Sequence, residues 1–133
     1  MANGLHLQIV TPRGPVVDAQ VSSLSAPGSF GEFQARPGHQ AYLVRLCPGI
    51  LHFDLDGKTR WYALSGGTAE VRHDSVTVLA DACEAGDDVD EARAKAASDR
   101  ARELLKSKES HVDHERARAS LERAAARMQV AGR

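Results

Sequence analysis

Arginine is the residue type in this chain best suited to binding a ligand, and it is concentrated in the C-terminal half. Arg93 and Arg100 precede a short polar turn, and Arg123 and Arg127 follow it, so two helices packed side by side can bring four guanidinium groups together. Each planar guanidinium can pair with two oxygens of a phosphate or carboxylate, which makes an anion the expected ligand. The alternative is a solvated charged face, in which glutamates such as Glu122 pair with arginines at helical spacing.

The other residues that could do chemistry do not form a catalytic or metal-binding set. Residues 65–68, Ser-Gly-Gly-Thr, lack the lysine and the following helix that a phosphate-binding loop requires. His39 lies in a Pro-Gly-His turn with no nucleophile nearby in the sequence. His111, Asp113 and His114 could bind a divalent cation weakly, although a solvated polar first turn of a helix explains them better. We therefore predict no catalytic residue and no metal ligand.

Charge and cysteine usage exclude several classes of partner. The chain has 133 residues with 17 basic and 18 acidic side chains, so we expect neither a nucleic-acid platform nor a polybasic membrane anchor. We also expect no secretory signal and no membrane-spanning segment. Cys47 and Cys83 lack CxxC spacing, which favours reduced thiols in a cytosolic compartment.

The N-terminal part of the chain, which must support the helices, has the pattern of a β module. Apolar residues alternate with polar ones, and Asp56-Gly57 between two such runs is a strong hairpin signal, because a tight primed turn needs positive φ. Proline- and glycine-containing turns separate the other runs. The predicted strands cover residues 5–10, 16–17, 21–24, 30–33, 41–46, 50–55, 59–64, 68–71 and 76–80. This arrangement predicts an antiparallel sandwich or flattened barrel, with a break at residues 26–29.

The sequence pattern changes at residues 84–90, after which alanine, arginine, glutamate and lysine dominate. We predict a β-sandwich domain over residues 1–84 and a helical hairpin over 85–133, hence an α+β fold with the β part first. The first helix is expected over 89–106, capped by Asp87 or Asp88. Ser110 with Asp113 predicts a capping box for the second helix, and the short connection makes the two helices antiparallel.

The apolar stripes of both helices are rich in alanine, which predicts weak packing. Alanine yields about a third of the transfer free energy of leucine, at ~25 cal/mol per Å². A hairpin held so weakly can be shifted between arrangements by a ligand or partner. The expected stripes are Val89, Ala92, Ala96, Ala97, Ala101, Leu104 and Leu105 in the first helix, and Ala117, Leu121, Ala124, Met128 and Ala131 in the second.

Taken in order, the motifs of the chain resemble those of the epsilon subunit of the F-type ATP synthase, over essentially the whole length. The resemblance is carried by His6-Leu7, Gly31-Glu32, Pro37-Gly38-His39, Pro48-Gly49, Ser65-Gly66-Gly67 before Glu70-Val71, and Val76 to Asp81. It implies a sandwich of about ten strands followed by a helical hairpin. It also implies a non-catalytic subunit without a required cofactor, in a peripheral complex on the cytoplasmic face of the bacterial inner membrane.

The resemblance further implies the partners of each part. The sandwich would bind the gamma subunit and rest on the ring of c subunits, with Glu32 and His39 facing them. The hairpin would either fold down on the sandwich or extend along gamma into the alpha/beta catalytic hexamer and block ATP hydrolysis. In the extended state the basic residues of the second helix would meet acidic segments of the beta subunits; these residues are Arg116, Arg118, Arg123 and Arg127.

Some bacterial members of this family bind ATP in the folded-down state through a motif of Ile or Leu, Asp, two variable residues, Arg and Ala. Residues 89–94 match it, with valine in the first position. The resemblance thus implies a regulatory ATP site formed by Glu84, Val89, Asp90, Arg93, Ala94, Arg100, Arg123 and Arg127. Arg93 would neutralise phosphate, and Asp90 would orient the site. The alternative function is a free-standing nucleotide sensor that works without the large complex.

Overall fold

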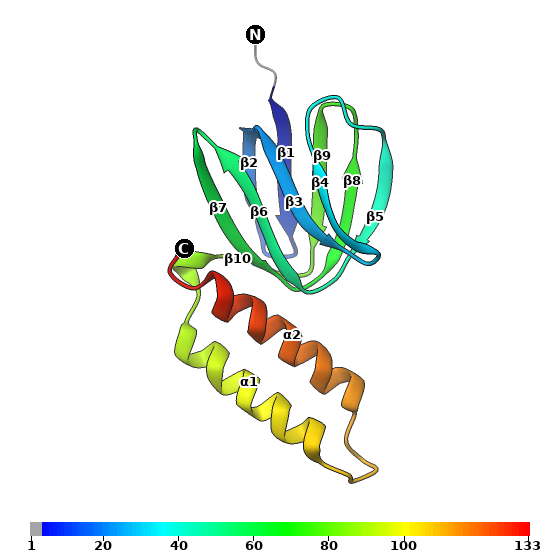
Figure 1. Ribbon diagram of the computed structural model, residues 1–133, viewed down its shortest axis with the longest axis vertical. Helices are drawn as coiled ribbons and strands as arrows, with labels where there is room; N and C mark the ends of the chain where they lie inside the picture. Colours follow the sequence, from blue (N-terminus) through cyan, green and yellow to red (C-terminus); the bar gives the residue numbers. More distant parts are fainter. Residues whose placement is uncertain (1–3) are drawn as a thin grey trace.

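Figure 1 shows a β-sandwich with a pair of helices packed beneath one end of it. This computed structural model describes residues 4–133. The predicted α+β class, with the β part first, is confirmed. The strands are β1 (Leu5–Thr11), β2 (Gly14–Val21), β3 (Ser23–Gly28), β4 (Gly31–Ala35), β5 (Tyr42–Leu46), β6 (Gly49–Leu55), β7 (Lys58–Leu64), β8 (Gly67–Val71), β9 (Ser75–Ala80) and β10 (Cys83–Ala85).

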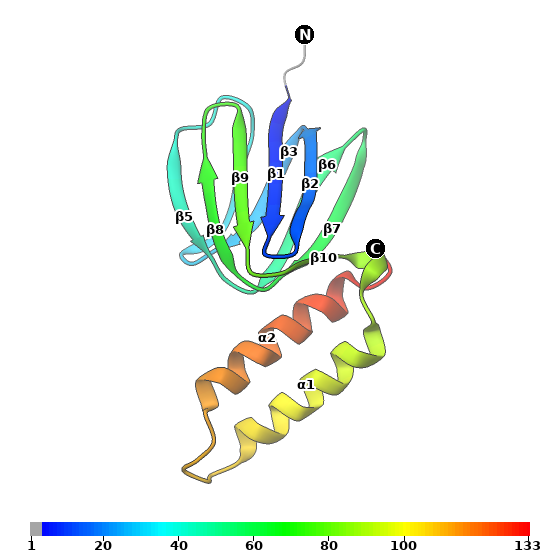
Figure 2. The same cartoon turned by 180° about the vertical axis from the view of Figure 1, so that it is seen from behind.

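The strands form one curled sheet, whose two layers are seen from opposite sides in Figures 1 and 2. The order is β10-β7-β6-β3-β5-β8-β9-β1-β2, and β4 pairs with β3. The pairings are antiparallel as predicted, except that β1 and β9 run parallel, with Ile9 opposite Val78. An all-antiparallel arrangement was therefore wrong at this seam. A long stretch of chain separates these two strands, so no tight turn dictates their relative direction.

The interior of the sandwich follows from the period-two pattern. In β1, Leu5, Leu7 and Ile9 are completely buried while the residues between them are partly exposed. Asp56 and Gly57, both with positive φ at 51° and 78°, form the tight turn between β6 and β7, as predicted. The remaining large buried side chains of the sandwich are Val21, Leu24, Leu46, Leu51, Phe53, Leu64, Val71, Val76 and Val78.

Several strand assignments from the sequence were wrong. The strand expected at 16–17 is part of the longer β2, the strand expected at 21–24 straddles the end of β2 and the start of β3, and β10 was missed because it has only three residues. The predicted break at residues 26–29 lies largely inside β3, where Pro27 pairs with Glu32 of β4. The Pro27 carbonyl accepts a hydrogen bond from Cys47 N at 2.9 Å. Because N and O of one strand residue point the same way, the missing N–H lies on the side away from β4, and the β3–β4 ladder is preserved.

The helical part contains a short 3-10 helix, η1 (Gly86–Asp88), then α1 (Glu91–Lys106) and α2 (His114–Val130). α1 begins two residues later than predicted, because its N-cap is Asp90, which accepts a hydrogen bond from Arg93 N. The N-cap of α2 is Asp113, which accepts from Arg116 N, and not Ser110. A carboxylate oxygen reaching the third amide of the helix satisfies one of its free donors in both cases. The expected antiparallel hairpin is confirmed.

The seam between the helices differs from the predicted stripe in α1. The buried residues there are Ala94, Ser98 and Ala101, whereas Ala92 and Ala96 are exposed and Leu104 is 47% exposed. Ser98 was missed because it reads as polar, although its small side chain suits close helix packing. In α2 the prediction was better: Ala117 and Ala124 are buried, and Leu121, Met128 and Ala131 are half-buried.

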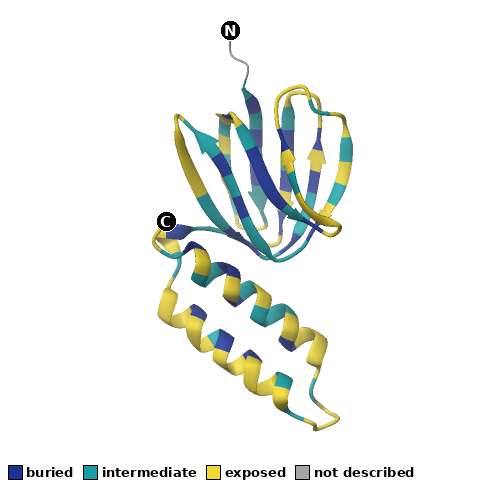
Figure 3. Cartoon of the chain, in the orientation of Figure 1, coloured by how far each residue is buried: buried dark blue, intermediate teal, exposed yellow. Residues whose placement is uncertain are grey.

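A second face of α2, not predicted, docks on the sandwich. Ala126 and Val130 are buried against Ala63 of β7. Ile50, Trp61 and Val89 are partly buried around this cluster. In Figure 3 this junction is the place where buried colour continues from the sheet into α2, while the outer surface of α1 is exposed. Neither helix is long and apolar enough to cross a bilayer, within the part of the chain that the structure describes.

Candidate functional site

A cavity of about 660 Å³ lies between the hairpin and the sandwich. Its floor on the sandwich side is the β1–β2 turn, with Thr11, Pro12 and Arg13, together with residues 81–84 leading into β10. Its other wall is the first half of α1, and Arg127 reaches it from α2. A ligand in this cavity would therefore touch both parts of the protein at once.

The structure brings together most of the residues expected to bind a nucleotide. Six of the eight line the cavity, namely Glu84, Asp90, Arg93, Ala94, Arg100 and Arg127. Val89 instead packs beside the cluster that docks α2 on the sandwich. Arg123 donates to Ser120 Oγ at 3.0 Å and lines a smaller neighbouring pocket, which it shares with Glu84 and Arg127. In the docked hairpin, the cavity thus holds three of the four predicted arginines.

Arg127 and Glu84 form the ion pair that joins α2 to β10. The Arg127 Nε to Glu84 Oε1 distance is 2.7 Å, and the side chains are 33% and 38% exposed. Because both remain partly in water, the pair stabilises docking by about 0–1 kcal/mol. Its stronger effect is geometric: it orients the Arg127 guanidinium at the edge of the cavity.

Charges of both signs line the cavity. The arginines are Arg13, Arg93, Arg100 and Arg127, and the carboxylates are Asp81, Glu84, Asp88 and Asp90. Glu84 is neutralised by Arg127, and Asp90 accepts the Arg93 backbone N–H as the N-cap of α1. Among residues 4–133, the side chains of Arg13, Arg93 and Arg100 form no salt bridge. These three guanidiniums are free to pair with an added anion.

Cys83 also lines the cavity, and burial raises the pKa of its thiol to about 12, with the neighbouring Glu84 charge adding to the effect. The neutral thiol is a poor nucleophile, so this cysteine contributes shape rather than reactivity. Cys47 and Cys83 are both free thiols, as expected from the sequence.

The remaining candidates from the sequence are accounted for by local contacts. His111 lies 3.1 Å from Glu109, and His114 Nε2 lies 2.7 Å from the Ser107 carbonyl oxygen. The part of the chain that the structure describes contains no group of three residues arranged to hold a metal ion. The glycines of residues 65–68 lead into a strand and not a helix, so this segment is no phosphate-binding loop.

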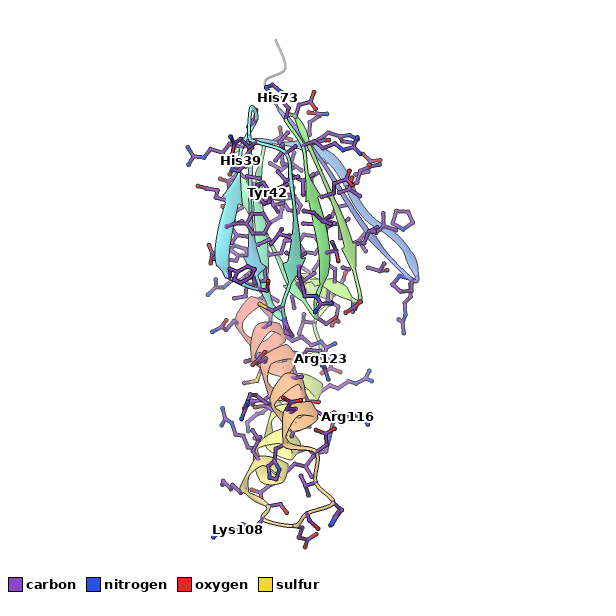
Figure 4. The ribbon with its side chains drawn as sticks, turned by 90° about the vertical axis from the view of Figure 1, so that its right-hand side faces the viewer. His39, Tyr42, His73, Lys108, Arg116 and Arg123 are labelled. Carbon is purple, nitrogen blue, oxygen red and sulfur yellow. The ribbon has the colours of Figure 1, made fainter. Side chains whose placement is uncertain are left out.

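The residues expected to contact partners are exposed or half-buried, and they are widely separated. Glu32 lies near the start of β4, whereas His39 follows the end of that strand and packs its ring 5.2 Å from that of Tyr42. Figure 4 shows His39 at the end of the sandwich away from the helices, and Arg116 and Arg123 along α2. Arg116 and Arg118 are both exposed. The sandwich and the hairpin therefore present separate surfaces.

The β1–β2 turn was missed as part of the site. Thr11 and Arg13 lie far from the helices in the sequence, since α1 begins only at Glu91, and no local motif connects the two regions. Asp81 and Asp88 were missed as well, since an acidic residue near an expected anion site gives no positive signal. Only the docking of the hairpin places these side chains around the same cavity.

The fold and the cavity place the chain in a structural class, that of a β-sandwich with a C-terminal helical hairpin docked on it. Residues 4–86 match the family model "ATP synthase, Delta/Epsilon chain, beta-sandwich domain". Residues 87–132 match the model "ATP synthase, Delta/Epsilon chain, long alpha-helix domain". The chain belongs to the ATP synthase delta/epsilon chain family, and the resemblance stated from its motifs is confirmed.

Bacterial relatives are similar over nearly the whole chain. The ATP synthase epsilon chain of Nitratidesulfovibrio vulgaris (strain DP4) is 46% identical over 99% of this chain and 98% of its own length. The epsilon chain of Syntrophobacter fumaroxidans is 41% identical over 98% of both chains. The epsilon chain of Bacillus velezensis is 40% identical over 96% of this chain and 97% of its own. The protein is thus an epsilon-type subunit of ATP synthase.

Solved structures share the fold. A chain in the Euglena gracilis mitochondrial ATP synthase, determined as an OSCP/F1/c-ring assembly in rotational state 1, superposes with a TM-score of 0.83 at 22% identity, covering 93% of this chain and 79% of that one. A chain of the Tetrahymena thermophila mitochondrial ATP synthase, from its central stalk and c-ring, gives a TM-score of 0.57 at 12% identity and covers 96% and 92% of the two chains.

Proposed function

We propose that this subunit is a non-catalytic part of the central stalk of an F-type ATP synthase, in which the sandwich binds the gamma subunit and the c-ring. Family membership supports this role, as do the positions of the exposed Glu32 and the half-buried His39 on the surface of the sandwich. The complex would be peripheral on the cytoplasmic face of the bacterial inner membrane. Residues 1–84 and 85–133 would act as separate functional domains.

The hairpin is proposed to regulate ATP hydrolysis by leaving the sandwich. The observation that carries this proposal is the small docking cluster, in which only Ala63, Ala126 and Val130 are buried. One valine and two alanines contribute about 2–5 kcal/mol of apolar burial, a quantity that one binding partner can exceed. Undocking would also release Arg127 from Glu84.

In the extended state, the basic face of α2 would meet acidic segments of the beta subunits in the alpha/beta hexamer. The residues of this face are Arg116, Arg118, Arg123 and Arg127. Arg127 would then belong to two alternative contacts, one with Glu84 when the hairpin is docked and one with the hexamer when it extends. A residue shared in this way couples the two states, since each contact excludes the other.

ATP is the proposed regulatory ligand of the cavity, and no cofactor is required. The volume of about 660 Å³ lies within the range of small-molecule sites, and Arg93, Arg100 and Arg127 supply guanidiniums for phosphate oxygens. Because the cavity is bounded by both the sandwich and α1, bound ATP would stabilise the docked hairpin. ATP would therefore oppose inhibition.

Calorimetric titration of the isolated chain with ATP tests the site. Arg93→Ala should abolish saturable binding, and ADP should compete. Arg102→Ala is the matched control, because Arg102 is an exposed residue of the same helix outside the cavity. Absence of heat from the wild-type chain up to millimolar ATP would contradict a regulatory ATP site.

Reconstitution with the remaining ATP synthase subunits tests the regulatory role. Removal of residues 88–133 should leave binding to gamma intact and raise ATP hydrolysis. An unchanged hydrolysis rate would contradict inhibition by the hairpin. Retention of ATP binding without affinity for gamma would instead favour the alternative function, a free-standing nucleotide sensor. This alternative can be tested on the isolated chain, because all residues that line the cavity belong to it.

A further inference from the structure

We propose that Arg13, in the β1–β2 turn, is a further ligand-binding residue of the cavity, where it pairs with the polyphosphate of a nucleoside triphosphate also held by Arg93 and Arg100. This inference rests on the proposed nucleotide site and extends it to the sandwich. The site motif in residues 89–94 contains no residue of this turn. The guanidinium of Arg13 is brought to the site by tertiary structure alone.

The turn that carries Arg13 is held by its own hydrogen bonds. Thr11 Oγ1 donates to the Gly14 carbonyl at 3.1 Å, and Arg13 N donates to Thr11 Oγ1 at 3.2 Å. Thr11 and Gly14 also form the last pair of the β1–β2 ladder. Figures 1 and 2 show this turn at the end of the sandwich that faces the helices. The backbone at Arg13 is therefore positioned before any ligand arrives.

The side chain of Arg13 has no competing structural role. It is exposed, and within residues 4–133 it forms neither a salt bridge nor a side-chain hydrogen bond. It lines the cavity opposite α1, whose Arg93 and Arg100 are likewise unpaired. An arginine that stabilised the fold would be expected to contact a carboxylate or an aromatic ring in the apo chain.

The charge pattern favours a ligand with several phosphates. Glu84 is already paired with Arg127, and Asp90 caps α1, which leaves Asp81 and Asp88 as the only uncommitted carboxylates among the lining residues. Three free guanidiniums then face two carboxylates. Because those guanidiniums come from a turn and from two positions along α1, a chain of phosphates can reach all of them, whereas a single phosphate would contact fewer.

This position gives Arg13 a regulatory consequence. Contacts with Arg93 and Arg100 alone would hold ATP on the hairpin, and the hairpin could leave with its ligand. A contact with Arg13 ties the same ligand to the sandwich, so that ATP binding and hairpin docking become thermodynamically linked. Loss of Arg13 should weaken this linkage as well as the affinity.

The test is calorimetric titration of the full chain with ATP, for the wild type, Arg13→Ala and Arg13→Lys. We expect at least a tenfold loss of ATP affinity for Arg13→Ala. The loss should be smaller for Arg13→Lys, which keeps the positive charge but cannot pair with two phosphate oxygens through a planar guanidinium. Arg36→Ala is the control, since Arg36 is an exposed arginine in the turn after β4 and does not line the cavity. Melting curves without ligand should be the same for all variants, because Arg13 makes no structural contact.

A second readout distinguishes direct contact from an indirect effect. ATP should shift the backbone amide resonances of Thr11, Arg13 and Gly14 in the wild type, and AMP should shift them less. Unchanged ATP affinity in Arg13→Ala, with binding still lost in Arg93→Ala, would overturn the role of Arg13 and leave the nucleotide site standing. No ATP binding by the wild-type chain would overturn both.

Discussion

Gly86 offers a substitution that acts on hairpin docking alone. It is buried in η1, directly beneath the C-terminal end of α2. A Cβ at this position would overlap the Val130 carbonyl oxygen and approach the Arg133 oxygen to 2.7 Å, and both are backbone atoms that cannot rotate away. Its φ is not in the left-handed region, so alanine fits the backbone once the hairpin has left. Gly86→Ala should therefore favour the undocked state.

The magnitude follows from the contacts that must separate. Val130, fully buried, contributes about 1.5–3 kcal/mol by leaving water. The hydrogen bond from Gly132 N to Gly86 O, 3.0 Å long, adds about 0.5–1.5 kcal/mol. Arg133 over the Trp61 ring, at 4.8 Å, adds about 0.5–1 kcal/mol. Loss of most of these contacts, roughly 3–5 kcal/mol, lowers the docking equilibrium constant by a factor on the order of 100 to several thousand.

Trp61 provides the assay, because it is the single tryptophan of the chain and lies in the docking cluster. Its ring lies 4.7 Å from that of His52 on the neighbouring strand β6, at a tilt of 33°, and contacts Arg133 only when α2 is docked. Gly86→Ala should shift its emission to longer wavelength and reduce hydrogen-exchange protection at the C-terminal end of α2. Asp87→Ala, at an exposed neighbouring position, is the control. Wild-type emission and protection in Gly86→Ala would refute the reasoning.

Three further predictions concern the helix seam, the cavity and the sandwich. Ala101→Leu should overpack the seam, where Ala101 is 2% exposed, and lower the thermal stability of the hairpin by about 1–3 kcal/mol; an unchanged helical melting curve would contradict close packing. Since the pKa of Cys83 is raised to about 12, iodoacetamide at pH 8 should label this thiol far more slowly in the folded than in the unfolded chain, and equal labelling in both states would argue against burial. The free energy of unfolding should also fall as the pH rises from about 9, where the thiol of the unfolded chain ionises, towards 12. The hydrogen bond from His6, at 2.6 Å, lowers the pKa of Asp18, so His6→Ala should raise that pKa towards 3.8 in a carboxyl NMR titration, and no change would mean that the pair is absent in solution.

Local patterns were sufficient for much of the fold. The alternation in β1 and the Asp56-Gly57 turn were predicted because side-chain period and turn conformation depend on neighbours in the chain. The two helices were predicted for the same reason, although their caps were displaced to Asp90 and Asp113. Several aspartates near a helix start compete for the cap, and the one selected depends on where the preceding chain leaves the sandwich.

The seams of the hairpin were predicted less well, because burial depends on what lies opposite. Ser98 is only 3% exposed, and Ala126 belongs to a face of α2 that docks on β7. An alanine-rich helix can present almost any side to a partner, so composition does not select one. Val89, expected at the ligand site, lies instead beside the docking cluster.

The sequence by itself determined that the chain has a β module, a helical hairpin and a set of arginines suited to an anion, because residue type and spacing act over short distances. Only the tertiary structure decided which side chains share a cavity. Arg93 and Arg100 meet Arg13 there because α2 packs on β6 and β7 and so holds α1 beside the β1–β2 turn. That docking depends on a few small side chains and on the absence of a Cβ at Gly86, whose partners lie more than 40 residues further along the chain.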